Sequence, residues 1–253
     1  MWPVVFKIPY LNFPISSFGV MMAAGFLVGT WLTALRMREE GLDPELASVL
    51  LGYVLIGGVA GSKLYFAVDM ALREGLPFFS LLFSREGITW YGGLLAGTLA
   101  GAWGCRRHGI PILDFTSCAA VAVPVGHALG RVGCFLVGDD YGGPSDLPWA
   151  LAFPLGAPPT LERVHPTQLY EVAWLLPLAA LLWARRRRSP FLFGEYLALA
   201  GLGRLLIEHW RVTPRVALGL SQAQWIGLAL LVAGTSGWLL LRSRVAAPSR
   251  DRT

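Results

Sequence analysis

The chain has 253 residues, of which 55% are hydrophobic and only 15% are charged. Because soluble globular proteins carry about 25% charged residues, this composition excludes a typical soluble domain and predicts a membrane protein. The formal net charge of +5 does not indicate nucleic-acid binding, since the basic residues lie between apolar runs. The sequence contains no nucleotide motif, no disulfide framework and no metal-ligand spacing among its cysteines, so we expect no cofactor and no metal.

Seven apolar runs approach the length of about 20 residues that a helix needs to cross a bilayer. They are 18–35, 47–68, 88–105, 110–129, 166–184, 191–210 and 224–241. Only Lys7 precedes the first run as a basic residue, so we expect a retained helix and not a signal peptide. Basic residues follow every second run, which predicts an external amino terminus and a cytoplasmic carboxyl terminus. We therefore expect one transmembrane domain over 1–241 and a disordered cytoplasmic tail over 242–253.

The segment 132–164, between the fourth and fifth runs, is rich in glycine and proline and is predicted to lie outside. Loops of this length are usually functional or disordered. Its aromatic and leucine residues favour an ordered cap that touches the membrane, with a flexible connector as the alternative. The predicted fold class is thus an all-α polytopic membrane protein, a bundle of about seven transmembrane helices with this cap.

The sixth run contains Arg204, Glu208 and Arg211 at positions i, i+4 and i+7, which predicts one shared helix face. An arginine at mid-helix costs about 2.5–3.5 kcal/mol on insertion scales, so this face must line a wet or protein-lined cavity. Two interpretations remain open. The Arg204–Glu208 pair either joins helices, with Arg211 extending to the headgroups, or forms part of a site.

Arg131 ends the fourth run within a glycine-rich segment, GRVGCFLVGDDYGG. Together with Arg204 it would place two guanidinium groups near the outer leaflet. Guanidinium groups are planar, permanently charged and bidentate towards phosphate, so we expect them to bind a phospholipid headgroup. Lys63 either adds a third positive charge there or extends to the membrane surface. His127, one turn before Arg131, is interpreted as a packing histidine with a direct role as the alternative.

The fifth run opens with VHPTQLYE, in which Pro166 suits the first turn of a helix. Gln168 and Glu171 lie on one helix face. Glu171 lies so far inside the apolar run that its charge is expected to have a specific role. The motif is either an internally bonded helix start or a support that orients the arginines.

These motifs resemble those of the bacterial prolipoprotein diacylglyceryl transferase family. The segment 130–143 resembles the family signature, HPTQLYE at 165–171 a second motif, and GRLLIEHWR at 203–211 a third. ITWYGGLLAG at 88–97 and FGVMMAAGF at 18–26 are similar to two further family segments. Their order, their spacing and the seven-run topology agree over nearly the whole chain.

The resemblance implies a multi-pass enzyme of the bacterial inner membrane, with the amino terminus and the cap in the periplasm and the carboxyl terminus in the cytoplasm. Such an enzyme moves the diacylglyceryl group of phosphatidylglycerol to the thiol of the lipobox cysteine in a prolipoprotein signal peptide. This is the first step of bacterial lipoprotein maturation. The implied partners are phosphatidylglycerol, the signal peptide and membrane lipid.

The resemblance also assigns site residues. The catalytic positions would be Arg131, Arg204, Glu208, Tyr91 and Asp139. Phosphatidylglycerol would contact Arg131, Arg204, Gly92, Gly93 and Gly142. The supporting positions would be His165, Gln168, Tyr170, Glu171 and Arg211.

Three positions depart from the family pattern. Tyr91 stands where many members have histidine, Phe18 replaces a tyrosine, and Cys134 replaces an asparagine. A phenol, with an ordinary pKa of about 10, is a poor general base. Either Tyr91 only orients a substrate group, or the thiol proton goes to Glu208, Asp139, a histidine such as His209, or the leaving phosphate.

Two other function classes remain open. A transporter would also have intramembrane charges and glycine-interrupted helices, although it commonly has paired repeats that this sequence lacks. A non-catalytic paralogue would bind lipid or signal peptide without transferring a group.

Overall fold

The computed structural model describes residues 1–246 except 11–12, 85–86, 88 and 190. The described chain is mostly helical and divides into two compact units. The first unit comprises Met1–Leu32 and Ala119–Thr253, and the second comprises Thr33–Cys118. Ile88, where the third predicted run begins, and 247–253 of the predicted tail lie outside the described residues.

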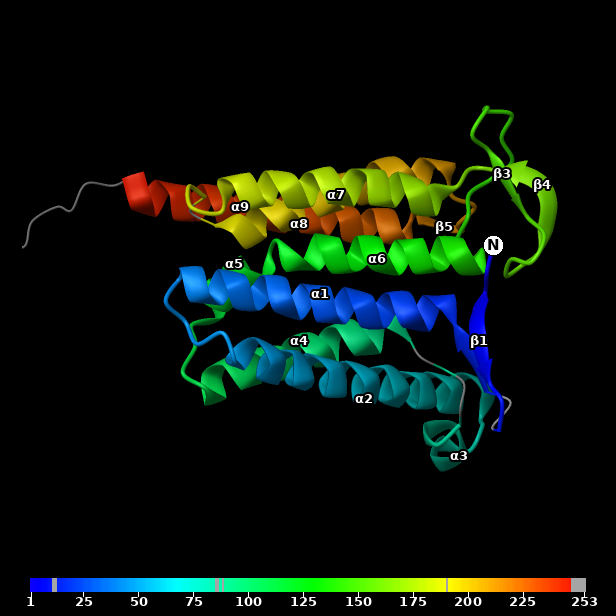
Figure 1. The fold of residues 1–253 in the computed structure, drawn as a ribbon, viewed down its shortest axis with the longest axis horizontal. Helices are drawn as coiled ribbons and strands as arrows, with labels where there is room; N and C mark the ends of the chain where they lie inside the picture. The colour runs from blue at the N-terminus through cyan, green and yellow to red at the C-terminus, as the bar shows by residue number, and fades with distance from the viewer. Residues whose placement is uncertain (11–12, 85–86, 88, 190, 247–253) are drawn as a thin grey trace, which may run out of the picture. The chain divides into compact units, whose positions relative to one another are not determined.

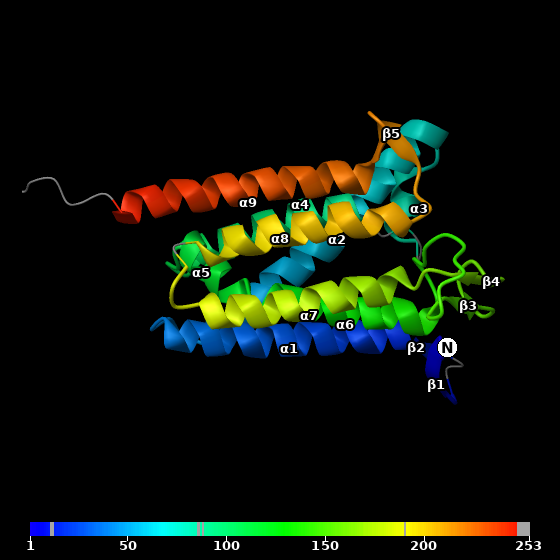
Figure 2. The same ribbon diagram turned by 90° about the horizontal axis from the view of Figure 1, so that it is seen from above.

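The first unit contains most of the chain, and Figures 1 and 2 label its helices. Its helices are the first part of α1 (Ser17–Glu39), α6 (Ala122–Val137), α7 (Thr167–Arg185), α8 (Leu192–Ile207), the 3-10 helix η1 (Glu208–Trp210) and α9 (Gln222–Ala246). Helix α6 packs on α7, α7 on α8, and α8 on α9. Glycines bring α1 and α6 together, since a Cβ on Gly25 would lie 3.0 Å from the backbone oxygen of Gly126.

Three hairpins in this unit were not predicted. They are β1 (Val4–Ile8) with β2 (Phe13–Ser16), β3 (Leu151–Phe153) with β4 (Thr160–Val164), and β5 (Arg215–Ala217) with β6 (Leu220–Ser221). All three are antiparallel, and β3–β4 lies by the end of α6 and the start of α7 (Figure 1). Their strands are too short to show an alternating pattern in the sequence.

The second unit is built on α2 (Leu46–Glu74) and α4 (Trp90–Arg107). It also contains α3 (Phe78–Leu82), α5 (Ile112–Ala119, which ends at the boundary between the units) and the last part of α1. Glycines let α2 and α4 approach closely, since a Cβ on Gly57 would lie 2.9 Å from the backbone oxygen of Ala96. Buried apolar side chains form the core near Leu50 and Cys105.

Four described helices are long and apolar enough to cross a membrane: α1, α2, α7 and α9 over 222–242. Helices α5 and α6 form a fifth span if they are counted together, although they are bent by 45°. The span predicted over 110–129 is therefore not one continuous helix, and its second part continues to Val137. Pro124 explains the break, because its ring clashes with the carbonyl group of Ala120 in a continuous helix.

Other boundaries also differ from the predictions. Helix α6 continues to Val137, so the first six residues of the predicted cap, 132–137, are helical. Helix α9 continues to Ala246 and includes the first five residues of the predicted tail. Lys63 lies inside α2, which continues to Glu74, and its ammonium group bonds Ser84 Oγ at 2.9 Å.

Candidate active site

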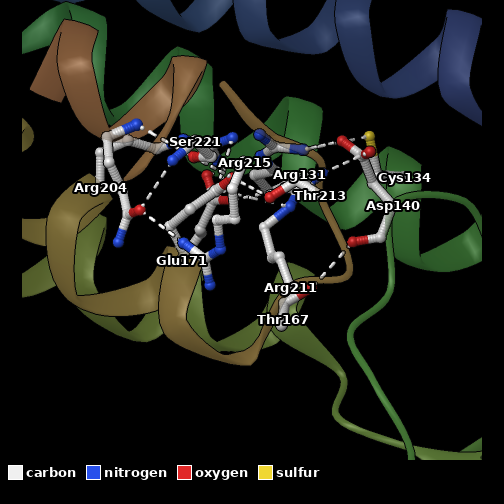
Figure 3. Close-up of polar contacts among 12 residues, drawn as sticks. Arg131, Cys134, Asp140, Thr167, Glu171, Arg204, Arg211, Thr213, Arg215 and Ser221 are labelled. Atoms are coloured by element: carbon white, nitrogen blue, oxygen red, sulfur yellow. Dashed lines mark hydrogen bonds and ion pairs between the residues drawn. The ribbon is translucent and has the colours of Figure 1, made fainter. Parts of the chain in front are cut away.

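Six charged side chains of the first unit form one cluster, which we call the arginine cluster, and Figure 3 labels five of them. Its members are Arg131 of α6, Asp140 after α6, Glu171 of α7, Arg204 of α8, Glu208 of η1, and Arg211 after η1. Three are cationic and three are anionic, so their formal charges cancel. The structure thus brings together two arginines, Arg131 and Arg204, that are 73 positions apart in the sequence.

Glu171 lies at the centre of the arginine cluster, and only 6% of its side chain is exposed. Its Oε2 accepts a hydrogen bond from Arg131 Nε at 2.7 Å. Its Oε1 accepts from Arg204 Nη1 at 3.0 Å and from Arg211 Nη1 at 3.3 Å. One buried carboxylate therefore fixes the spacing of three guanidinium groups.

Glu208 is fully buried and anchors the far side of Arg204. Its Oε1 accepts hydrogen bonds from Thr213 Oγ1 at 2.6 Å and from Ser221 Oγ at 2.8 Å. Its Oε2 forms an ion pair with Arg204 Nη2 at 3.0 Å, without the alignment of a hydrogen bond. These contacts hold the buried Glu208 carboxylate in one orientation.

Arg211 reaches the arginine cluster by a route that the sequence did not predict. Helix α8 ends at Ile207, the turn η1 follows, and Arg211 has an extended backbone, so the prediction of one helix face through Arg211 is wrong. Its side chain is nevertheless only 8% exposed. It pairs with Asp140 and Glu171, so it does not extend to the membrane surface.

Of the two adjacent aspartates, Asp140 faces the arginines. Its Oδ2 accepts from Arg131 Nη1 at 2.7 Å and its Oδ1 from Arg211 Nη2 at 2.5 Å. Burial would raise the pKa of Asp140, but the charges of Arg211 and Arg131 hold the pKa below its ordinary value. Asp139, which the resemblance assigned, has a buried Oδ1 without a hydrogen-bond partner, and burial raises its pKa.

Gly142 joins three segments through its backbone. Its N–H donates to the backbone oxygen of His165 at 2.8 Å, and the next N–H donates to that of Trp210 at 2.9 Å. A Cβ on Gly142 would lie 2.8 Å from Thr167 Cγ2 and closer still to the Trp210 oxygen. This packing requires glycine whether or not the residue contacts lipid.

The residues of the HPTQLYE motif support this junction. Gln168 Nε2 donates to the Asp139 backbone oxygen at 2.5 Å, and Thr167 Oγ1 donates to that of Asp140 at 2.8 Å. His165 Nδ1 lies 3.1 Å from the Tyr170 hydroxyl, which accepts from an indole N–H of the cap. His127, on α6, lies 3.5 Å from Glu171 Oε2.

Tyr91, Gly92 and Gly93 belong to the second unit, at the start of α4. The structure therefore does not join them with the arginine cluster in one unit. Tyr91 is 39% exposed, and its ring centroid lies 6.4 Å from that of Tyr65. A Cβ on Gly93 would lie 3.3 Å from the backbone oxygen of Gly58, so the paired glycines allow α4 to pack on α2.

A family model described as prolipoprotein diacylglyceryl transferase matches residues 3–240. The chain belongs to this family. Relatives named phosphatidylglycerol–prolipoprotein diacylglyceryl transferase include those of Gloeobacter violaceus, Parasynechococcus marenigrum and Geobacter sulfurreducens. The first is 34% identical to this chain, and the match covers 94% of this chain and 93% of the relative. The second is 33% identical, with 99% and 98% covered. The third is 30% identical, with 97% of each covered.

Membership of the prolipoprotein diacylglyceryl transferase family confirms the resemblance inferred from the motifs. The chain is a transferase of lipoprotein biosynthesis, and its apolar helices make it a multi-pass membrane protein. The family favours this class over the transporter that the sequence left open.

Two departures from the family pattern lie beside the arginine cluster. Cys134 Sγ is 3.9 Å from Arg131 Nη1, and Phe18 packs on α6, since a Cβ on Gly133 would lie 3.2 Å from it. Both are therefore close to the segment that carries Arg131. Among the residues that the structure describes, no group of three His, Cys, Asp or Glu could hold a metal ion.

Proposed function

We propose that this transferase moves the diacylglyceryl group of phosphatidylglycerol to the thiol of a lipobox cysteine in a prolipoprotein. The observation that carries the proposal is the convergence of Arg131 and Arg204 on one buried carboxylate. Paired guanidinium groups in a site of low dielectric suit an anionic phosphate. The names of the relatives supply the donor and the acceptor class.

Each of the two arginines has a guanidinium nitrogen that is not used in its ion pairs and could donate to a phosphate. Arg131 uses Nε and Nη1 in its ion pairs, and Arg204 uses Nη1 and Nη2. Among the described residues, neither Arg131 Nη2 nor Arg204 Nε donates a hydrogen bond to the chain. Their side chains are 14% and 25% exposed, so both remain partly open to a phospholipid headgroup.

The reaction would be a displacement at the terminal glyceryl carbon. The substrate sulfur forms the new C–S bond, the C–O bond to phosphate breaks, and glycerol phosphate leaves with the bonding electrons. Negative charge grows on the phosphate, so arginines fixed in advance by Glu171 and Glu208 would stabilise the transition state more than the bound lipid.

The thiol proton must pass to a base or to the departing phosphate, because a cysteine thiol is mostly protonated at neutral pH. Glu208 is an unfavourable acceptor, since Thr213, Ser221 and Arg204 occupy its oxygens. Asp139, with a raised pKa and one unbonded oxygen, is a better acceptor in the first unit. We propose that Tyr91 orients a substrate group.

The site would face the outside of the inner membrane. Glu171 and the basic end of α7 at Arg185 are 14 residues apart, or about 21 Å at 1.5 Å per residue. Because basic ends lie in the cytoplasm, the arginine cluster and the neighbouring hairpin β3–β4 would lie on the periplasmic side. We also propose a seven-span topology with an external amino terminus and a cytoplasmic carboxyl terminus.

Complementation tests the proposal. The chain should sustain prolipoprotein modification in cells depleted of their own transferase, and the purified chain should form a thioether on a lipobox peptide in vesicles that contain phosphatidylglycerol. Stable membrane expression without any thioether product would instead support the non-catalytic paralogue.

A further inference from the structure

The three carboxylates of the arginine cluster differ in their access to solvent. The side chains of Glu171 and Glu208 are 6% and 0% exposed, whereas that of Asp140 is 44% exposed. Removing a buried carboxylate from its arginines would leave uncompensated buried charge, which is strongly unfavourable. A half-exposed carboxylate can instead turn towards water at a lower cost, because water replaces part of its hydrogen bonding. Only Asp140 is therefore placed to leave the arginine cluster.

Asp140 also has the contacts of a bound anion. Its two oxygens bridge Arg131 Nη1 and Arg211 Nη2, as two oxygens of a phosphate would (Figure 3). The arginine cluster is neutral with Asp140 in place and has a net charge of +1 without it. An incoming phosphate therefore meets a cationic site only when this carboxylate moves away.

The backbone of Asp140 is held in position. It has a left-handed conformation with φ of 63°, and its carbonyl oxygen accepts from Thr167 Oγ1 at 2.8 Å. The preceding carbonyl, of Asp139, accepts from Gln168. Exchange of the carboxylate would therefore require rotation of one side chain and no movement of the loop, which is a fast change for a partly exposed residue.

We propose that the Asp140 carboxylate is an exchangeable counter-ion, which occupies an anion position between Arg131 and Arg211 until a phosphate bound by Arg131 and Arg204 displaces it from Arg131. This inference rests on the proposed function for the source of the phosphate, and it adds a residue that competes with substrate and product. The phosphodiester of the lipid carries one negative charge. The departing glycerol phosphate is a monoester, whose phosphate can carry a second negative charge. Asp140 would therefore compete with both and help to expel the product.

Direct binding of glycerol phosphate tests the inference without relying on turnover. The full-length chain in nanodiscs without phosphatidylglycerol would be titrated with glycerol phosphate by calorimetry. Loss of a competing charge-assisted contact should tighten binding about tenfold in Asp140→Asn. Asparagine adopts the left-handed conformation readily, and Asp140→Gly provides a second variant without steric strain there.

Asp146→Asn is the matched control, because Asp146 is an exposed aspartate of the same segment and its replacement changes the net charge equally. Binding by this variant should equal that of the wild type. Unchanged or weaker binding in both Asp140 variants would overturn the inference and indicate a permanent support for the arginines. A separate failure of the wild type to form thioether product would count against the proposed function alone.

Discussion

Replacing Glu171 with glutamine should disrupt the arginine cluster more than any other single change to a carboxylate. The substitution keeps the size of the side chain but removes the charge that three guanidinium groups share at 2.7, 3.0 and 3.3 Å. A charge pair about 4 Å apart is worth about 4 kcal/mol at an effective dielectric constant of about 20. Desolvation offsets much of this, and removing one partner of a buried pair typically costs about 3–5 kcal/mol.

If about 3 kcal/mol of this cost falls on the transition state, the transfer rate should fall about 100-fold. The assay is thioether formation on a lipobox peptide in phosphatidylglycerol vesicles, together with the free energy of unfolding in mixed micelles. Glu162→Gln, at an exposed position of β4, is the control and should match the wild type in both measurements. A Glu171→Gln enzyme with normal turnover and stability would refute the assignment of Glu171 as the centre of the site.

Four further predictions follow from the same contacts. Arg131→Lys should reduce transfer by at least about 100-fold in the vesicle assay, because a point charge replaces a bidentate donor, and near-normal turnover would argue against phosphate binding there. Gly142→Ala should lower the melting temperature and the transfer rate, since its Cβ would meet Thr167 and the Trp210 oxygen, whereas Gly52→Ala, with nothing within 4 Å, should not. Tyr91→Phe should retain the kcat of thioether formation within about tenfold if the phenol only orients a substrate group, and a loss of about 1000-fold would assign it the proton transfer. Because the pKa of Asp140 is lowered, its ion pairs should stabilise the fold above the unfolded pKa of about 3.8, and this stability should be lost as the pH falls through the lower folded pKa. An unfolding series that shows equal acid destabilisation in Asp140→Asn and the wild type would contradict that assignment.

Hydropathy predicted the positions of most helices because it depends on composition over many residues. It did not predict the break before α6, since Pro124 lies in an apolar run and acts through one backbone clash with Ala120. The hairpins were missed for a related reason, because strands such as β3, with three residues, are too short for a periodic pattern.

The arginine cluster was predictable in part. Arg131, Arg204 and Glu171 were indicated by the high free energy of charged side chains inside a membrane and by the resemblance of the motifs to those of the family. The structure brings these three residues together. The resemblance assigned Asp139, whereas the structure places the carboxylate of Asp140, which has a left-handed backbone, on the arginines. The position of Asp140 directly after Asp139 was the sequence feature that could have indicated Asp140 as a site residue.

The position of Arg211 shows a different limit of sequence analysis. Helical spacing placed it on the face of Arg204, but the chain leaves the helix after Ile207. Arg211 joins the cluster because its segment pairs with the loop that follows α6. Gly142 forms an isolated bridge with Arg211, and the Gly143 N–H donates to the Trp210 oxygen. Such long-range backbone pairing has no local pattern in the sequence.

The central claim is that Arg131 and Arg204 together hold the phosphate of the lipid donor. The most direct measurement is a structure of the full-length chain in nanodiscs with bound phosphatidylglycerol. We predict phosphate oxygens about 2.7–2.9 Å from guanidinium nitrogens of both arginines. A phosphate bound elsewhere, with both arginines still occupied only by the chain's own carboxylates, would contradict the claim.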